Sequence, residues 1–270
     1  MTIYALVPKH SPVHLWGLSS TQRLQRQLKQ ISKESGDEFR DIRWLESSDD
    51  LPAAGQVLLL NGTFLFESRT IRRVLDHANC ILQFSDNETA AAFVDAGHVP
   101  AVLAFMEDSS LNPPEDLKVM QTNEMQAFDL TLSRSTQPLL EPVSPGRKSE
   151  LENNLYGNAY KGITDLVTKF VWPKPAKRFV HLCASLRISP NMVTSFGLLL
   201  VVLACYLFYS GQYGLGLLAA WFMTFLDTVD GKLARVTIQS SKFGHLYDHI
   251  IDLVHPPFWY IYWGMSLLNF

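Results

Sequence analysis

Short apolar runs alternate with amphipathic stretches over the first half of the chain. The apolar runs predict strands, which we place at Ile3–Val7, Val57–Leu60, Cys80–Phe84 and Val99–Phe105. The stretches between them predict helices: one capped by Ser19 or Ser20 with Leu24, Leu28 and Ile31 on one face, one at Thr70–Ala78 and one at Glu88–Asp95. Strands that alternate with helices indicate a mainly parallel, covered sheet. We therefore expect a soluble α/β domain over residues 1–136.

Turn-forming residues interrupt this pattern between Gln137 and Ser149, where three prolines and a glycine fall close together. This composition predicts a linker, which we place at residues 137–153. Two amphipathic helices are expected over residues 154–187, Leu155–Trp172 and a basic helix after Pro175. Their apolar faces fit either the membrane surface or ordinary packing between domains.

The second half of the chain is dominated by long apolar segments. No charged residue occurs from Met192 to Leu226, and a bilayer-spanning helix needs only about 20 apolar residues. A Ser-Gly-Gln segment divides this run, so we expect a helical hairpin with spans at about Pro190–Tyr209 and Tyr213–Val236. A third span begins near Phe243. Residues 188–270 are therefore predicted to form an all-α membrane domain with three transmembrane helices.

Basic residues flank the predicted spans unevenly. They precede the first span and recur between the second and third, whereas the loop at Gly211 has none. The positive-inside rule then places the N-terminal domain and the turn from Lys232 to Lys242 in the cytoplasm. The formal net charge of −3 gives no indication of nucleic-acid binding, and no nucleic-acid partner is expected.

Two pairs of aspartates lie at the cytoplasmic ends of the second and third spans. Asp227 and Asp230 are three residues apart, and Asp248 and Asp252 are four apart, so each pair shares one helix face. An antiparallel hairpin would bring the four carboxylates together, where they repel one another and are costly to desolvate. Bound divalent cations would offset the negative charge of the carboxylates. Carboxylate oxygens are hard ligands of the kind that Mg²⁺ or Mn²⁺ prefers. Two ions about 4 Å apart could bridge a diphosphate.

The spacing of these aspartates carries a family resemblance. It reads Asp227-x2-Asp230-Gly231-x2-Ala234-Arg235-x8-Gly244-x3-Asp248-x3-Asp252. This pattern matches the signature of the CDP-alcohol phosphotransferase family at every fixed position. The segment Pro190-Asn191-x2-Thr194 also resembles the start of the first membrane helix in that family, so the resemblance covers about Leu155 to Phe270.

The resemblance implies a role for each matching residue. Asp227, Asp230 and Asp248 would hold the metals, and Asp252 would lie near the second metal and act as general base on the acceptor hydroxyl. The donor site would be formed by the remaining residues: Gly231, Ala234 and Gly244 shaping the nucleotide pocket, Arg235 and Ser241 contacting the donor or its phosphates, and Asn191 and Thr194 holding the cytidine end. For Arg235, a helix-end salt bridge with an aspartate is the alternative. His249 and His255 are not needed as metal ligands.

The function implied by the resemblance is transfer of a phospho-alcohol from a CDP-linked donor to an alcohol acceptor, with release of CMP. Phosphatidyl transfer from CDP-diacylglycerol in phospholipid biosynthesis is the leading interpretation. The runner-up is a CDP-linked small alcohol of the choline, ethanolamine or inositol kind with a lipid acceptor. Lys232 and His249 resemble variants found in the choline and ethanolamine branch. A non-catalytic membrane scaffold is a third possibility.

Two expectations concern the extent of the protein. Family members have about six membrane helices, so we expect residues to be missing after Phe270 or the chain to be a fragment. We also expect a homodimer in the lipid bilayer.

The N-terminal domain resembles sugar-nucleotidyltransferase-like domains at one strand, Val57 to Thr63. In an active enzyme of that kind a metal-binding aspartate follows the glycine, whereas here Thr63 follows Gly62. The first strand leads into Val7–Pro12, which has no glycine to cradle a triphosphate. We therefore expect a degenerate nucleotidyltransferase-like fold. The alternatives are an unrelated α/β regulatory module, or an active nucleotidyltransferase with a membrane anchor.

Overall fold

The computed structural model describes residues 2–34, 41–84, 88–108, 111–122, 127–129, 134–136, 139–159, 167 and 170–268. The chain divides into two compact units, Met1–Leu151 and Glu152–Phe270.

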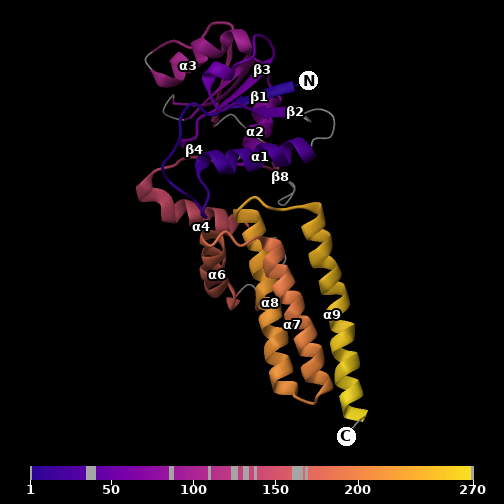
Figure 1. The fold of residues 1–270 in the computed structure, drawn as a ribbon. Coiled ribbons are helices and arrows are strands. Elements are labelled where there is room, and N and C mark those ends of the chain that lie inside the picture. The colour runs from indigo at the N-terminus through magenta and orange to yellow at the C-terminus, as the bar shows by residue number, and fades with distance from the viewer. Residues whose placement is uncertain are drawn as a thin grey trace. The chain divides into compact units, whose positions relative to one another are not determined.

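A six-stranded mixed sheet forms the centre of the first unit (Figure 1). In spatial order its strands are β2 (Asp41–Trp44), β1 (Thr2–Leu6), β3 (Gln56–Leu60), β6 (Thr89–Asp95), β5 (Cys80–Gln83) and β7 (Lys118–Gln121). Strand β1 pairs in parallel with β2 and β3, and β5 pairs in parallel with β7. Strand β6 runs antiparallel between β3 and β5. The expected sheet is therefore present, but it is mixed.

Helices cover both faces of this sheet. On one face lie α1 (Ser20–Glu34) and α2 (Ser68–Leu75), and the predicted apolar stripe of α1 is buried against the sheet through Leu24, Leu28 and Ile31. On the other face lies α3 (Val99–Glu107), which packs on residues of β3 and β6. Cys80 is buried in the apolar core between the sheet and helices α1 and α2. This burial raises the pKa of its thiol to about 11.

Two predicted elements of the first unit have the wrong type. The segment predicted as a helix at Glu88–Asp95 is strand β6, and the segment predicted as a strand at Val99–Phe105 is helix α3. Six of the seven β6 residues are buried, so this strand shows no alternation of polar and apolar positions. A short, wholly apolar run does not distinguish a buried strand from a buried helix. The alanines of β6 favour a helix and made the correct choice harder, whereas Pro100 in the first turn of α3 was a helix-start signal that the prediction did not use.

The segment predicted as a linker is partly ordered structure of the first unit. Leu140–Pro142 forms β10, which pairs antiparallel with β4 (Phe64–Phe66). Arg147 then joins Glu141 and Glu150 through ion pairs where α4 (Lys148–Asn158) begins. The first unit thus extends to Leu151. A short ribbon of β8 (Ala127–Asp129) and β9 (Arg134–Thr136) completes its strands within the described residues.

The second unit is helical. After the end of α4 it contains α6 (Pro173–Ser185), α7 (Pro190–Tyr209), α8 (Tyr213–Val236) and α9 (Lys242–Leu268). The three apolar helices begin and end where the sequence predicts. Ser189 caps α7 by accepting a hydrogen bond from the Met192 amide, and a proline occupies its first turn. Much of the helix predicted at Leu155–Trp172 lies outside the described residues.

Helices α7 and α8 form a hairpin, and α9 packs along α7 (Figure 1). The turn between α7 and α8 places Gly211 at a φ of 73°, a conformation that glycine adopts without strain. Phe208 lies directly against Gly216 and stacks on Trp263 of α9. Trp259 donates its indole N–H to the Val201 carbonyl. These tryptophans therefore pack between helices.

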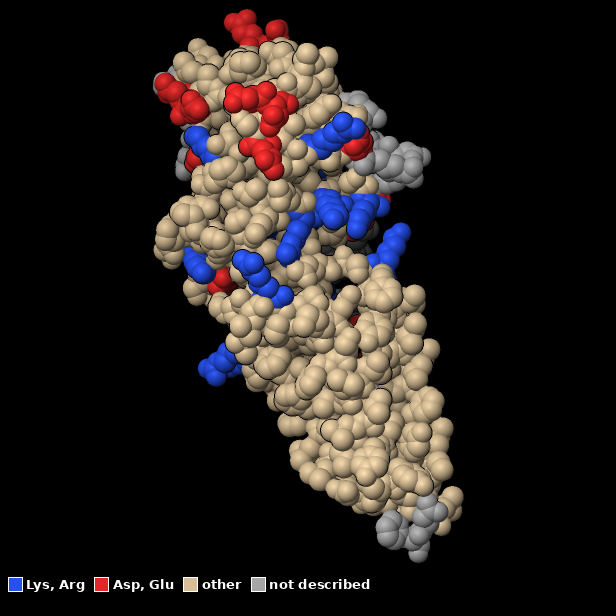
Figure 2. Space-filling view, in the orientation of Figure 1, with Lys and Arg blue, Asp and Glu red and all other residues tan. Residues whose placement is uncertain are grey.

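The outer surface of these helices is apolar. Figure 2 shows that the end of α7, α8 and α9 away from the α8–α9 turn carries no Lys, Arg, Asp or Glu on the visible face. Within the described part of the chain, α7 alone has the length and mean hydropathy, 2.2, of a membrane-crossing helix. Exposed side chains such as Leu199, Leu218 and Leu253 extend this apolar surface over all three helices.

Candidate active site

Three of the four signature aspartates, two on α8 and one on α9, form a compact cluster. Oxygen atoms of Asp227, Asp230 and Asp248 all lie within 4.8 Å of one another. Asp230 is only 4% exposed, while Asp227 and Asp248 are partly exposed. Asp252 follows Asp248 by one helical turn, is exposed and does not belong to this cluster. Packing of α8 and α9 on α7 thus brings together three of the four carboxylates that the spacing predicts to meet.

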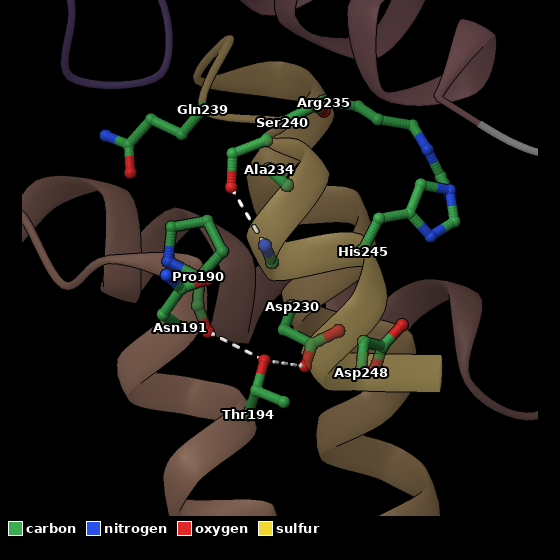
Figure 3. A pocket seen from close by; sticks show the side chains of 13 residues that line it. Pro190, Asn191, Thr194, Asp230, Ala234, Arg235, Gln239, Ser240, His245 and Asp248 are labelled. Atoms are coloured by element: carbon green, nitrogen blue, oxygen red, sulfur yellow. Dashed lines mark hydrogen bonds between the residues drawn. The ribbon is translucent and has the colours of Figure 1, made fainter. Parts of the chain in front are cut away.

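A hydroxyl from the neighbouring helix fixes the most buried carboxylate. Thr194 of α7 donates a 2.5 Å hydrogen bond to Asp230, and the same hydroxyl lies 3.1 Å from the Pro190 carbonyl (Figure 3). Both Thr194 and Asp230 are buried. A hydrogen bond to a charged acceptor is stronger than one between neutral groups. The pair therefore ties α7 to α8 at the acidic cluster.

A cleft of about 110 Å³, open to solvent, adjoins the cluster and shares Asp230 and Asp248 with it (Figure 3). It is lined by every residue that the sequence assigns to the donor site: Asn191, Thr194, Gly231, Ala234, Arg235, Ser241 and Gly244. These residues come from α7, α8, the α8–α9 turn and α9. One cavity therefore unites polar side chains, small residues and carboxylates.

The start of α9 approaches α7 closely at Gly244. A side chain at this position would place its Cβ 2.9 Å from the Asn191 Oδ1 and 3.1 Å from the Ser241 Oγ. The Ser241 hydroxyl also accepts a hydrogen bond from the Gly244 amide, which satisfies one of the unpaired donors of the first turn. The glycine thus leaves Asn191 and Ser241 in place on the cleft wall.

The Arg235 guanidinium is held by a backbone carbonyl. Its Nη1 donates a 2.5 Å hydrogen bond to the Ala159 carbonyl, so the described residues do not form the alternative helix-end salt bridge. A Cβ at Gly231 would lie 3.6 Å from Nη2 of Arg235. The glycine therefore keeps the space beside the guanidinium open on the cleft side.

Four further residues line the cleft without having been predicted: Pro190, Gln239, Ser240 and His245. Gln239 and Ser240 belong to the polar turn that precedes Ser241, and this run of hydrogen-bonding residues was the available signal. His245 follows Gly244 at a position whose residue type the signature does not fix. His249 and His255 lie outside the acidic cluster, and the His255 Nδ1 lies 2.9 Å from the Ile251 carbonyl.

The cluster has the chemistry of a divalent cation site. It offers three carboxylates, hard oxygen ligands of the kind that Mg²⁺ and Mn²⁺ prefer. Carboxylates this close repel one another unless a cation or protons offset their charge. The hydrogen bond from Thr194 also orients one ligand, as groups around metal ligands commonly do. The side chains therefore fit a cation.

Comparison with known proteins finds similarity over the same segment. Residues 187–269 match the family model described as CDP-alcohol phosphatidyltransferase. The chain is 44% identical over 80 residues to archaetidylinositol phosphate synthase of Pyrococcus horikoshii, covering 29% of this chain and 42% of that protein. It is 30% identical over 128 residues to cholinephosphotransferase 1 of Gallus gallus, covering 43% and 37%. The chain therefore spans less than half the length of these relatives.

Proposed function

The chain carries a CDP-alcohol phosphatidyltransferase domain at residues 187–269, and from this premise we propose that it catalyses metal-dependent transfer of a phospho-alcohol from a CDP-linked donor to an alcohol. The observation that carries this proposal is that the acidic cluster and the donor cleft have two residues in common. Asp230 and Asp248 belong both to the acidic cluster and to the cleft that holds the donor-site residues. A diphosphate in the cleft would therefore lie against the carboxylates.

The proposed reaction is a displacement at phosphorus. The acceptor hydroxyl oxygen forms a bond to the phosphorus that carries the donor alcohol, and the bond from that phosphorus to the oxygen bridging the two phosphates breaks. CMP leaves with this oxygen, and Asp252 accepts the proton of the attacking hydroxyl. Asp227, Asp230 and Asp248 would hold Mg²⁺ or Mn²⁺, in two ions. When bound, these ions offset the negative charge of the diphosphate.

The residues of the cleft have separate parts in this proposal. Arg235 would contact the donor phosphates, because its guanidinium lies beside the space left by Gly231. Ser241 would also contact the donor, and Asn191 and Thr194 would hold its cytidine end. Ala234 and Gly244 keep the wall close to the backbone, so that a nucleotide can approach.

For the substrates, we propose phosphatidyl transfer from CDP-diacylglycerol to an alcohol acceptor. The similarity to a protein named archaetidylinositol phosphate synthase supports a lipid-linked donor. The similarity to a protein named cholinephosphotransferase supports the second candidate, a CDP-linked small alcohol with a lipid acceptor. Both candidates use the same cleft and release CMP.

The remaining proposals concern the setting of the domain. We propose that α7, α8 and α9 cross the bilayer with the acidic cluster on the cytoplasmic side, that the protein is a homodimer, and that the first unit is a catalytically inactive nucleotidyltransferase-like domain. In the first unit, the Gly62 amide donates to the Lys9 carbonyl, and a Cβ at Gly62 would lie 2.6 Å from that oxygen. The loop after β1 therefore packs directly on the strand end before Thr63, and this contact supports the proposal that no metal-bound triphosphate is held there.

A donor and acceptor panel tests the proposal. The purified chain in detergent is incubated with Mg²⁺ and either CDP-diacylglycerol plus small alcohols, or CDP-choline, CDP-ethanolamine or CDP-inositol plus diacylglycerol. CMP release is then measured together with the lipid product. We expect CMP and a phospholipid in one arm of the panel and neither with the Asp230→Asn variant. A chain that releases no CMP with any pair contradicts the proposal.

A further inference from the structure

One contact to the signature helix α8 comes from outside the segment that matches the family. Tyr156 lies near the end of α4, before the matched residues 187–269, and is 5% exposed. The Nζ of Lys232 lies 4.7 Å from the centroid of the Tyr156 ring. This distance is within the range of a cation–π interaction. The tyrosine hydroxyl also donates a 3.4 Å hydrogen bond to the Pro173 carbonyl, which anchors the ring at the start of α6.

Lys232 faces away from the donor cleft. Gly231, Ala234 and Arg235 line the cleft, whereas Lys232 does not and is only 3% exposed. A buried ammonium group is costly without a compensating interaction, and the face of an aromatic ring supplies one. Lys232 therefore connects α8 to the end of α4, and it does not line the cleft.

The same short segment holds the arginine of the cleft. Ala159 follows Tyr156 by one turn, and its carbonyl accepts the hydrogen bond from Nη1 of Arg235. Lys232 and Arg235 are three residues apart on α8 and share one face of that helix, and Tyr156 and Ala159 contact one of them each. Since the acceptor is a neutral carbonyl, the guanidinium keeps its positive charge for an anionic ligand. A carboxylate in the same place would compete with that ligand.

From these contacts we infer that Tyr156 is a positioning residue for donor binding. Its ring fixes Lys232, and this fixes the end of α4 so that the Ala159 carbonyl directs Arg235 into the cleft. The identification of the ligand as a diphosphate rests on the proposed function. Tyr156 determines where the guanidinium N–H groups of Arg235 lie in the cleft. Its loss should therefore lower ligand affinity and leave the chemical step unchanged.

CDP is the probe for this inference, because it contains the cytidine and both phosphates common to every CDP-linked donor. Titration of the full chain with CDP and Mg²⁺ compares the wild type with Tyr156→Leu and with Tyr156→Phe, which keeps the ring. We expect Tyr156→Leu to raise the Kd for CDP about tenfold, equivalent to about 1.4 kcal/mol. Tyr156→Phe stays within about twofold of the wild type, because only the weak hydroxyl contact is lost. In turnover assays the loss appears in the donor KM while kcat is kept.

A second variant tests the same contact in case Tyr156→Leu does not fold. Lys232→Met keeps an unbranched side chain, one atom shorter, and leaves the tyrosine in place, and it removes the charge that faces the ring. We expect it to weaken CDP binding to a similar degree, with no further loss in the double variant Tyr156→Leu/Lys232→Met. Folded variants that bind CDP as tightly as the wild type overturn the inference. A wild-type chain that binds no CDP overturns the proposed function instead, and the inference with it.

Discussion

At the scale of single residues, the site depends on how one buried carboxylate is held. Asp230 is the least exposed member of the acidic cluster, and the Thr194 hydroxyl donates to it from another helix. A hydrogen bond to a charged group contributes about 1.5–3 kcal/mol. The orientation of this ligand therefore depends on a residue that carries no charge itself.

Replacing Thr194 by valine removes this hydrogen bond and keeps the shape of the side chain. We expect Thr194→Val to weaken Mn²⁺ binding by about tenfold or more, from the magnitude of a charged hydrogen bond. Thr194→Ser, which keeps the hydroxyl, serves as the matched control and should bind Mn²⁺ nearly as the wild type does. Electron paramagnetic resonance of Mn²⁺ measures both affinities. Equal affinities for the valine and serine variants would show that the contact does not orient the ligand.

Asp252 has a different position, and a different consequence is expected from its loss. It is exposed and lies outside the cluster formed by the other three aspartates. We therefore expect Asp252→Asn to keep Mn²⁺ and CDP affinity but to reduce transfer by about 10²–10⁴-fold, as is typical when a general base is removed. Asp230→Asn, in contrast, should lose metal binding itself. If both variants lose Mn²⁺ equally, Asp252 is chiefly a ligand.

The candidate site was largely predictable at this scale because its residues have fixed spacing in the sequence. Every residue assigned to the donor site lines one cleft. The residues that were missed, such as Gln239 and His245, occupy positions where the spacing specifies no residue type. Lys232 was linked to the substrate, because its position directly after Gly231 resembles the choline and ethanolamine branch. In the structure its side chain packs on Tyr156. Which side of a helix faces a cavity depends on its neighbours, and these come from distant parts of the chain.

At the scale of secondary structure, length and periodicity decided which predictions held. The apolar helices of the second unit are long, so their bounds followed from the pattern of charged residues and glycines. Strand β6 and helix α3 are short and buried, and their types were exchanged in the prediction. Their local sequences fit either structure. The decision came from the sheet, in which β6 fills the space between β3 and β5.

The close approach of α9 to α7 gives a prediction at this scale. An alanine at Gly244 would crowd Asn191 and Ser241, whose side chains can turn aside. Alanine also favours the helix by up to about 1 kcal/mol relative to glycine. We therefore expect Gly244→Ala to leave the melting temperature unchanged or raised while CDP binding falls several-fold, because two cleft residues move.

Gly264 of the same helix provides the control. A Cβ at this position meets no atom within 4 Å, so Gly264→Ala gains the same helix propensity without touching the cleft. Calorimetry and CDP titration of both variants separate the two effects. Loss of CDP binding in both variants, or in neither, would contradict the role given to Gly244.

At the scale of the whole molecule, the chain joins an α/β unit to a helical unit of different character. Of the 26 acidic residues, few fall in the helical unit, and four of these are the signature aspartates. Helix α7 has the properties of a membrane-crossing helix, and the neighbouring helices extend its apolar surface. Carboxylates are energetically costly in such surroundings, so their presence there indicates a functional site. Their retention at the end of an apolar hairpin is what the proposed metal site explains.

The sequence predicts an α/β part and a helical part, but it does not give the boundary between them or the order of the sheet. The charge density falls after Arg187 in the sequence, whereas the two units of the structure divide at Leu151. The antiparallel insertion of β6 and the pairing of β10 with β4 join segments far apart along the chain. A single sequence gives no signal for such long-range pairings. The boundary at Leu151 and the ordered part of the predicted linker follow from those pairings.

The measurement that tests the central claim most directly is CMP release from a CDP-linked donor as a function of Mg²⁺ concentration. The wild-type chain is compared with Asp227→Asn, which removes one charge from the cluster and keeps the shape of the side chain. We expect chelation with EDTA to abolish CMP release by the wild type and added Mg²⁺ or Mn²⁺ to restore it. Asp227→Asn should stay inactive at metal concentrations that saturate the wild type. CMP release that continues at its full rate in EDTA, or in the Asp227→Asn variant, would contradict the central claim.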